Sequence, residues 1–263
     1  YFRKEHVHYY TEKSPDELAV INYTSGTTGF SKGVMIPYRA LWSNIDFAYS
    51  VLGNTVKKGD SVISILPMAH MYGMSFEFLF EFIAGCHVFY LTRIPSPAII
   101  AQAFSEVKPK IIISVPLIIE KIIKKKVFPK IQDPKLRLLM KMPGINKRVF
   151  EKICDQVTKA FGGEFYEVII GGAAFSQEVE KFLYRIGFHY TVGYGATECA
   201  PIICYADYKT YVPGSCGRAA KNMQVKVVSE DPANIPGEIL AKGPNVMLGY
   251  YKNEEATKAS IDA

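Results

Sequence analysis

Apolar and polar positions alternate in blocks along the middle of the chain, residues 60–195. The apolar blocks are short and rich in β-branched and aromatic residues, which is typical of buried strands. They are SVISIL (61–66), HVFYL (87–91), KIIISV (110–115), YEVIIGG (166–172) and HYTVGYG (189–195). Helix-like segments separate them. This alternation predicts an α/β fold with a doubly wound, mostly parallel sheet and helices on both faces.

Two of the intervening segments have clear helix start and stop signals. In SPAIIAQAFSEV, Ser96 is placed to cap the helix and Pro97 occupies its first position. In SQEVEKFLYRIG, Glu178 in the first turn and Arg185 in the last complement the helix dipole, and Gly187 ends the helix. The apolar face of this second helix consists of Val179, Phe182, Leu183 and Ile186.

The pattern of the sequence changes after about Tyr205, where prolines and glycines become frequent. Prolines and glycines break the chain into short segments such as MQVKVV (223–228) and GEILAKG (237–243). Short strands separated by turn residues are typical of a small β-rich module, such as a partial barrel. We therefore expect an α/β part over residues 1–205, with a candidate binding loop near its start, and a β-rich module over residues 206–263.

Composition narrows the class of protein. The chain has 263 residues, of which 49% are hydrophobic, so it can bury a proper core. The sequence contains no uninterrupted run of about 18 apolar residues, so we do not expect a membrane-spanning helix. No signal-peptide pattern follows Tyr1. The five cysteines form neither metal-like pairs nor a close framework, so we expect buried free thiols and a cytoplasmic location. Because the first residue is not Met, we expect a piece of a longer protein.

The net charge of +6 is concentrated in residues 121–147, where lysines alternate with isoleucine, leucine and methionine. A solvated helical face explains such a run most simply. Attraction to anionic lipid headgroups is a second interpretation, which would make the protein peripheral to a membrane. We do not expect a nucleic-acid partner, because the aromatic residues are not interleaved with the basic ones. The oligomeric state stays open.

The stretch TSGTTGFSKG, residues 24–33, contains the residue types that most clearly indicate a binding site. Its glycines let backbone N–H groups approach an anion closely, its hydroxyl groups are donors, and Lys32 adds a mobile positive charge. The spacing does not match the Walker pattern. A hydroxyl-rich surface turn is the plain alternative, but such a density of donors favours a polyphosphate. The candidate phosphate-binding residues are Thr24, Ser25, Gly26, Thr27, Thr28, Gly29 and Lys32.

YTSGTTGFSKG resembles the phosphate-loop signature of the acyl-adenylating superfamily, which includes acyl-CoA synthetases, luciferases and peptide-synthetase adenylation domains. Ser31 replaces the proline usual before the lysine, at a position that stiffens the loop. VIIGGAAF and the insertion over about residues 124–161 resemble the long-chain acyl-CoA synthetase branch. Four further segments are similar to the family's motifs and follow in its order: ILPMAHMYG (65–73), IIGGAAF (169–175), GYGATECAP (193–201) and GEILAKGPNVMLGYYKNEEAT (237–257).

The resemblance implies an ATP-dependent fatty acid–CoA ligase, with ATP, Mg²⁺, a fatty acid and coenzyme A as its small-molecule partners. Such an enzyme joins a carboxylate to the α-phosphorus of ATP, expels pyrophosphate, and passes the acyl group from acyl-AMP to a thiol. It must stabilise negative charge on the phosphates, chiefly with N–H dipoles, Lys32 and Mg²⁺. We expect Glu198 to be the magnesium ligand and Thr197 to donate to the α-phosphate. An exposed loop acid is the plain alternative for Glu198.

The resemblance also implies an adenine pocket and a positioning residue. The small side chains after a buried strand would let a flat base lie against the backbone, and Tyr194 would stack on its other face; an ordinary Gly-Gly turn is the alternative. His70 would position substrate where carboxylate and phosphate meet, although a lone histidine is more often simply a satisfied polar residue. The remaining residues of this pocket are Gly172, Ala173, Ala174 and Gly195.

Substrate class is less defined. Six apolar side chains would suit a fatty-acid tunnel, although a plain core has the same pattern: Met68, Met71, Met74, Phe76, Phe78 and Leu79. The family's large domain continues into a Thr-Gly-Asp segment and a small domain with a catalytic lysine, which these residues lack, so we expect weak ATP binding at best and no thioester formation from the chain alone. Two alternatives stay open: an acyl-AMP ligase that loads a carrier protein, and a non-catalytic nucleotide- or lipid-binding module.

Overall fold

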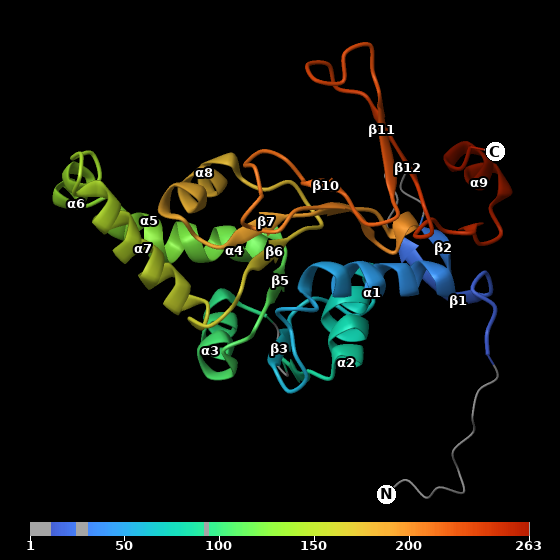
Figure 1. Cartoon of the computed structure of the whole chain (residues 1–263), viewed down its shortest axis with the longest axis horizontal. Coiled ribbons are helices and arrows are strands. Elements are labelled where there is room, and N and C mark those ends of the chain that lie inside the picture. The colour runs from blue at the N-terminus through green and yellow to red at the C-terminus, as the bar shows by residue number, and fades with distance from the viewer. Residues whose placement is uncertain (1–11, 25–30, 92–94, 263) are drawn as a thin grey trace, which may run out of the picture.

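The computed structural model describes residues 12–24, 31–91 and 95–262. Within these ranges the strands form five small sheets with helices packed around them, which confirms the predicted α/β class (Figure 1). Two of the sheets are parallel and three are antiparallel. The predicted mostly parallel sheet is therefore present as two short parallel sheets, and antiparallel pairs supply the rest.

The parallel strands lie within the predicted apolar runs but are shorter than those runs. β3 (Ser61–Ser64) pairs with β4 (His87–Tyr90), and β6 (Val168–Ile170) lies between β5 (Ile112–Ser114) and β7 (Tyr190–Val192). Parallel strands place their carboxyl ends at one edge of the sheet, which is where open α/β sheets bind ligands. The segments that follow β6 and β7 therefore lie side by side.

The helices with sequence signals form as predicted. In α3 (Pro97–Val107) the Ser96 hydroxyl accepts a hydrogen bond from the Ile99 N–H at 3.3 Å, and α8 (Gln177–Ile186) ends at Gly187 in the left-handed conformation. The long helix α1 covers Tyr38–Leu52. The other helical elements are η2 (Gly73–Leu79), α2 (Phe80–Ala84), α4 (Pro116–Ile122), η3 (Ile123–Val127), α5 (Phe128–Ile131), α6 (Pro134–Leu139), α7 (Asn146–Ala160), η4 (Thr197–Cys199) and α9 (Glu254–Ser260).

The antiparallel strands include one that the sequence did not reveal. β1 (Leu18–Thr24) pairs with β2 (Lys32–Pro37), so the candidate phosphate loop joins the two strands of a hairpin. β2 was hidden because its apolar run, residues 34–36, is only three residues long and Pro37 ends it next to α1. The remaining strands are β8 (Tyr194–Gly195), β9 (Ile202–Tyr205), β10 (Arg218–Ala219), β11 (Gln224–Val228), β12 (Glu238–Lys242) and β13 (Gly249–Tyr250).

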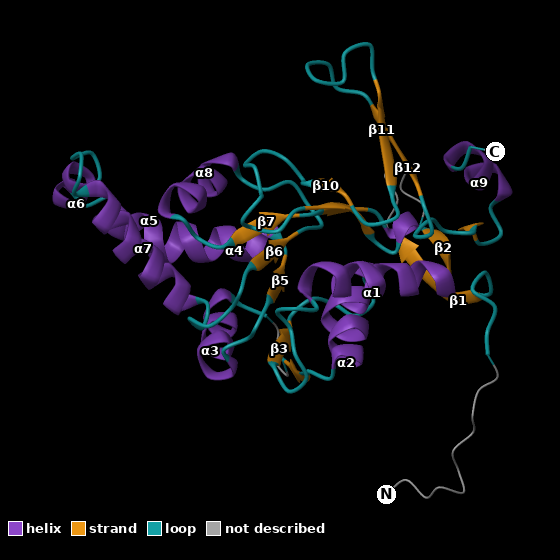
Figure 2. Cartoon of the chain, in the orientation of Figure 1, coloured by secondary structure: helices purple, strands orange, loops and turns teal. Residues whose placement is uncertain are grey.

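The β-rich C-terminal region does not close into a barrel within the described residues. β11 and β12 form a two-stranded ribbon that projects from the body (Figure 2). β13 pairs with β2, so the last strand of this region belongs to the sheet of the N-terminal hairpin. The division of the chain near residue 205 stays a prediction.

The core consists of separate apolar clusters on the two sides of the short sheets. The largest lies among β5, β6 and β7 and the helices α3, α4, α7 and α8, where Ile112, Ile119, Phe161 and Leu183 are completely buried. A second cluster joins α1 to η2 and α2 through residues such as Phe47 and Phe80. The second cluster borders the cavity described below.

Candidate nucleotide and acyl site

The segment around β13 joins the two charged candidates of the site. The Met247 N–H donates to the Glu198 carbonyl at 2.9 Å, and the Tyr251 N–H donates to the Gly33 carbonyl at 2.7 Å. Five residues of one strand segment thus connect the turn that contains Glu198 to the start of β2. Gly249 permits this path, because its φ of +137° suits glycine and a Cβ there would lie 2.7 Å from the Thr257 Cγ2.

Tyr250 lies between Lys32 and Glu198. Its hydroxyl donates a 2.7 Å hydrogen bond to the Glu198 Oε1, and the Lys32 Nζ lies 4.7 Å from the centre of its ring. Burial and the Glu198 carboxylate raise the pKa of Tyr250 to about 12, so the hydroxyl remains a donor at neutral pH. The structure therefore brings the Lys32 ammonium to the ring and the Glu198 carboxylate to the hydroxyl of one tyrosine, although Lys32 and Glu198 are far apart in sequence.

The hairpin places Thr24 directly opposite Lys32. The residues between them, including the candidates Ser25, Gly26, Thr27, Thr28 and Gly29, lie outside the described residues. Both ends of the loop are fixed by the strand pairing, and the end that contains Lys32 adjoins the Glu198 turn through β13. Of the residues predicted to bind phosphate, the described ones thus come together with the predicted metal ligand.

The Glu198 turn is held by buried polar contacts. The Asn44 side chain donates to the Cys199 carbonyl at 3.2 Å and to the Ala40 carbonyl at 2.8 Å, and accepts from the Ile202 N–H at 3.0 Å. Ser75 donates to the Ala200 carbonyl at 2.8 Å. Helix α1 and the helical stretch η2 therefore fix the turn by side-chain bonds to its backbone, which leaves the Thr197 and Glu198 side chains for other contacts.

The candidate adenine residues lie at the carboxyl ends of two neighbouring strands. The Gly171 N–H donates to Ser114 of β5 at 3.1 Å, and the Gly193 N–H donates to Ile170 of β6 at 2.9 Å. Gly172 has a φ of +86°, and it and its two alanine neighbours, Ala173 and Ala174, are exposed. Tyr194 and Gly195 follow Gly193 in β8, so the small turn and the tyrosine predicted to enclose the base are adjacent.

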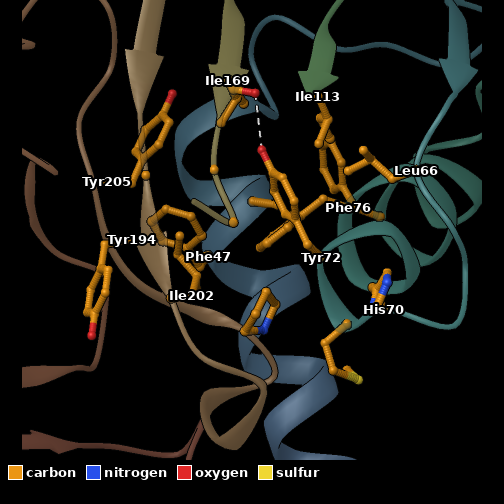
Figure 3. Close-up of a pocket in the computed structure, with 18 of the residues that line it drawn as sticks. Phe47, Leu66, His70, Tyr72, Phe76, Ile113, Ile169, Tyr194, Ile202 and Tyr205 are labelled. Atoms are coloured by element: carbon orange, nitrogen blue, oxygen red, sulfur yellow. Dashed lines mark hydrogen bonds between the residues drawn. The ribbon is translucent and has the colours of Figure 1, made fainter. Parts of the chain in front are cut away.

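A cavity of about 420 Å³ extends from these strand ends into the second apolar cluster (Figure 3). Among the described residues its lining contains no aspartate, glutamate, lysine or arginine. The polar ends of two lining tyrosines are already satisfied, because Tyr72 donates to the Ile169 carbonyl at 3.1 Å and Tyr205 donates to the buried Glu167. The cavity therefore presents mainly hydrocarbon and aromatic surface.

His70, Tyr194 and Thr197 line the same cavity, as do Gly172 and Gly195. In Figure 3 His70 and Tyr194 lie on opposite sides, with Tyr72 between them. The turn that contains His70 is fixed by the buried Asn22, whose amide donates to the Ala69 carbonyl at 2.6 Å. Of the six apolar residues suggested for a tunnel, Met71 and Phe76 line the cavity, whereas Met68, Met74, Phe78 and Leu79 are not among its lining residues.

A buried carboxylate supports one wall of the cavity. Glu77 accepts hydrogen bonds from the Leu66 N–H at 2.8 Å, the Ile65 N–H at 3.1 Å and the Ser64 hydroxyl at 3.1 Å. These bonds fix the end of β3, and Leu66 lines the cavity. Burial raises the pKa of Glu77 to about 7, against the opposing effect of these bonds. Burial also raises the pKa of the neighbouring Glu81, and the charge of Glu77 adds to that effect.

We expect Glu77→Gln to change how stability depends on pH. The pKa of Glu77 in the folded protein lies above its ordinary value of 4.5, so between about pH 4.5 and 7 the folded protein keeps a proton that the unfolded chain has released. Stability due to this group therefore falls as pH rises through that window. Relative to the Glu77→Gln variant, the free energy of unfolding of the unsubstituted protein should fall by about 3 kcal/mol between pH 5 and 8. Urea unfolding at several pH values measures this difference; the exposed Glu230→Gln serves as control, and parallel pH profiles for parent and Glu77→Gln would contradict the expectation.

The donor set at Glu198 suits magnesium bound together with phosphates. In the part of the chain that the structure describes, no three histidine, cysteine, aspartate or glutamate side chains gather into a metal site. Mg²⁺ commonly uses one or two protein carboxylates and takes its other ligands from water and substrate phosphates. A single carboxylate beside a lysine fits that arrangement, and Glu198 is the residue that would hold the ion.

Four residues of the site were missed by the sequence analysis: Asn22, Asn44, Tyr72 and Tyr250. Two of them had a usable signal, because a polar amide within an apolar strand or helix needs a hydrogen-bond partner. Tyr250 lay within a segment recognised for its resemblance, but spacing alone gave no reason to connect it with Glu198 or with Lys32, which lies more than 200 positions earlier. Its role depends on the pairing of β13 with β2.

Comparisons with known proteins show the family to which the chain belongs. A family model described as AMP-binding enzyme matches residues 3–251, so the chain belongs to the AMP-binding enzyme family. A probable 4-coumarate–CoA ligase from Dictyostelium discoideum is 30% identical, with 94% of this chain and 41% of that protein covered. The peroxisomal long chain acyl-CoA synthetase 6 of Arabidopsis thaliana is also 30% identical, over 94% of this chain and 38% of that protein. The chain thus spans about two fifths of the length of the curated relatives it matches.

Solved structures show the same fold. A double mutant of the o-succinylbenzoate CoA synthetase of Bacillus subtilis aligns with a TM-score of 0.73 at 22% identity, covering 95% of this chain and 45% of that one. The same enzyme in complex with ATP and magnesium ion aligns with a TM-score of 0.70, again at 22% identity and over 95% of this chain and 46% of that one. The described residues include no helix long and apolar enough to span a membrane.

Proposed function

We propose that the chain supplies the nucleotide- and acid-binding part of an ATP-dependent acid–CoA ligase, and that the acid is a long-chain fatty acid. The observation that supports this most is the arrangement of Lys32, Tyr250 and Glu198 beside an uncharged cavity. Thr197 lines the cavity and is the neighbour of Glu198 in sequence. The carboxylate of a fatty acid whose alkyl chain fills the cavity would thus lie next to the phosphates of ATP.

The residues present account for the charge chemistry of adenylation. A carboxylate is a poor electrophile, and attack on the α-phosphorus of ATP turns it into acyl-AMP, from which AMP leaves readily. The developing charge lies on phosphate oxygens, so catalysis needs fixed positive groups and N–H dipoles. Lys32 would contact the phosphates, Thr197 would donate to the α-phosphate, and Mg²⁺ held by Glu198 would neutralise charge. Tyr250 would keep the Glu198 carboxylate oriented.

The remaining predicted residues are proposed to hold adenine and the acid. Gly172, Ala173 and Ala174 present a surface without bulky side chains, and Tyr194 is half-exposed beside it, so a base could lie between them. His70 lies across the cavity and would position the carboxylate. Thr24 and the loop residues that follow it would provide N–H and hydroxyl donors to the outer phosphates.

The cavity favours an alkyl chain over a charged or strongly polar acid. Burying a second carboxylate or a free hydroxyl without a partner would cost several kcal/mol, and the hydroxyls of Tyr72 and Tyr205 are already in use. A volume of about 420 Å³ lies in the usual range for small organic ligands. Fatty acids are therefore the proposed class, with coenzyme A as acceptor.

Pyrophosphate exchange into ATP by the native protein tests this proposal. Exchange should depend on added fatty acid and should increase with chain length until the cavity is filled. Succinate and 4-coumarate should support far less exchange. The absence of any acid-dependent exchange would contradict the ligase proposal. A non-catalytic binding module would then be the remaining interpretation. Offering coenzyme A and then a carrier protein as acceptor separates the CoA ligase from the carrier-loading alternative.

Filling the cavity should shift the preferred acid. Ala48 lines the cavity from α1 and is 1% exposed, so Ala48→Phe would place a ring in the space proposed for the alkyl chain. Because each methylene in an apolar pocket changes kcat/KM about tenfold or more, the variant should lose at least tenfold on the longest good substrate and little on short acids. Ala98→Phe, at an exposed position of α3, is the matched control. An unchanged chain-length profile would show that the cavity does not bind the acid.

A further inference from the structure

Residues 121–148 form a helical arm at one end of the longest axis of the molecule (Figure 1). The arm comprises the end of α4, η3, α5, α6 and the first turn of α7. Near its tip, four apolar side chains within eight residues are exposed. They are Leu138 at 63%, Leu139 at 37%, Met142 at 38% and Ile145 at 41% of their full surface. An exposed apolar cluster of this kind is typical of an interaction surface.

Positive charge surrounds this cluster. The arm contains ten lysines and arginines and one acid, Asp133, so the rest of the chain has more acids than bases. Asp133 accepts hydrogen bonds from the Lys135 and Leu136 N–H groups, which caps α6. Of the ten cations, all of them in the described part of the chain, only Lys124 forms an ion pair, with Glu120 at 3.5 Å. The others are available to an anionic partner.

A groove of about 370 Å³ beside the arm also combines positive charge with apolar surface. It lies among α5, α6 and α8 and combines the cations Arg137, Lys181 and Arg185 with apolar side chains such as Phe128 and Met140; one acid, Glu178, also lines it. A groove lined by both cations and apolar side chains suits a lipid headgroup phosphate with its attached hydrocarbon. The groove and the exposed cluster share α6, so they can meet one surface together.

We propose that this arm docks the protein on an anionic phospholipid bilayer. Leu138, Leu139, Met142 and Ile145 enter the interface, and the surrounding lysines lie at the level of the headgroups. A bilayer offers an apolar phase below a negative surface, which fits both features of the arm. An acidic protein partner would match the charge, but it would also need a groove for four separate side chains. The proposal does not depend on the ligase chemistry.

Vesicle flotation with the native protein tests this inference. The protein should bind phosphatidylcholine vesicles that contain phosphatidylglycerol and bind pure phosphatidylcholine vesicles at least tenfold more weakly. Leu138→Glu combined with Met142→Glu should lower the partition coefficient on the order of tenfold or more. Lys135→Glu combined with Lys141→Glu should lower it on the order of tenfold or more as well, and raised salt should weaken binding of the parent.

Matched controls separate docking from a general effect of charge. Val212→Glu changes a residue as exposed as Leu138, at 63%, but outside the arm. Lys226→Glu with Lys242→Glu makes the same charge change on the β11–β12 ribbon. Both controls should bind like the parent, and circular dichroism should show every variant folded. Absence of vesicle binding, equal loss in arm and control variants, or binding to polyglutamate in preference to the vesicles would overturn the proposal.

Discussion

Glu198→Gln should lower the rate of acid-dependent pyrophosphate exchange by the native protein about a thousandfold. The carboxylate is the proposed ligand for the ion that neutralises phosphate charge, and an amide supplies no negative charge to hold it. Gln can still accept the hydrogen bond from Tyr250, so the turn should keep its shape and stability. The effect should therefore appear in kcat/KM and in the magnesium dependence, with no shift of the unfolding midpoint.

Glu230→Gln is the control for this experiment, because Glu230 is exposed and follows the end of β11. It should exchange pyrophosphate at the parental rate. A Glu198→Gln variant with activity within threefold of the parent would remove Glu198 from the phosphate chemistry. In that case its hydrogen bond with Tyr250 would be a structural contact only.

Asn44→Ala should destabilise the protein by about 3 kcal/mol and slow adenylation on the order of tenfold. The side chain is completely buried, and its removal leaves the Ala40 and Cys199 carbonyls and the Ile202 N–H without that partner. The Cys199 carbonyl belongs to the turn that contains Glu198, and Ile202 begins the strand that follows this turn, so stability and activity should fall together. Urea unfolding and pyrophosphate exchange measure the two effects.

Asn54→Ala is the matched control, since Asn54 is exposed just beyond the same helix. Its unfolding free energy should stay within about 0.5 kcal/mol of the parent. If Asn44→Ala were as stable and active as this control, the turn would not depend on α1 for its position. The account of how the sequence places Glu198 would then be wrong.

The α/β class and most of the helices and strands in residues 60–195 could be predicted because each element has a local signal. β-branched runs mark β5, β6 and β7, and a cap, a proline and a glycine mark the ends of α3 and α8. Glu198 and the candidate loop could be selected because their residue types match a known arrangement of motifs. These signals depend on neighbours in sequence, which a single sequence displays directly.

The remaining features depend on contacts between distant residues. β2 and β13 are short, and their pairing is decided by tertiary packing, so local periodicity could not reveal that Tyr250 meets both Lys32 and Glu198. The cavity likewise arises from five separate segments of the chain, and only two of the six residues suggested for a tunnel line it. The lysine-rich segment could be recognised as a basic helical face, but its exposed leucines could be identified only once α6 was placed at the end of the molecule.

Lys32 and Glu198 are proposed to bind a metal–triphosphate together, beside the uncharged cavity. Anomalous diffraction from crystals of the native protein with Mn²⁺ and a nonhydrolysable ATP analogue would locate the ion. We expect a manganese peak about 2.1 Å from a Glu198 oxygen, with phosphate density reaching the Lys32 ammonium. A nucleotide bound elsewhere, or a metal without contact to Glu198, would contradict this proposal.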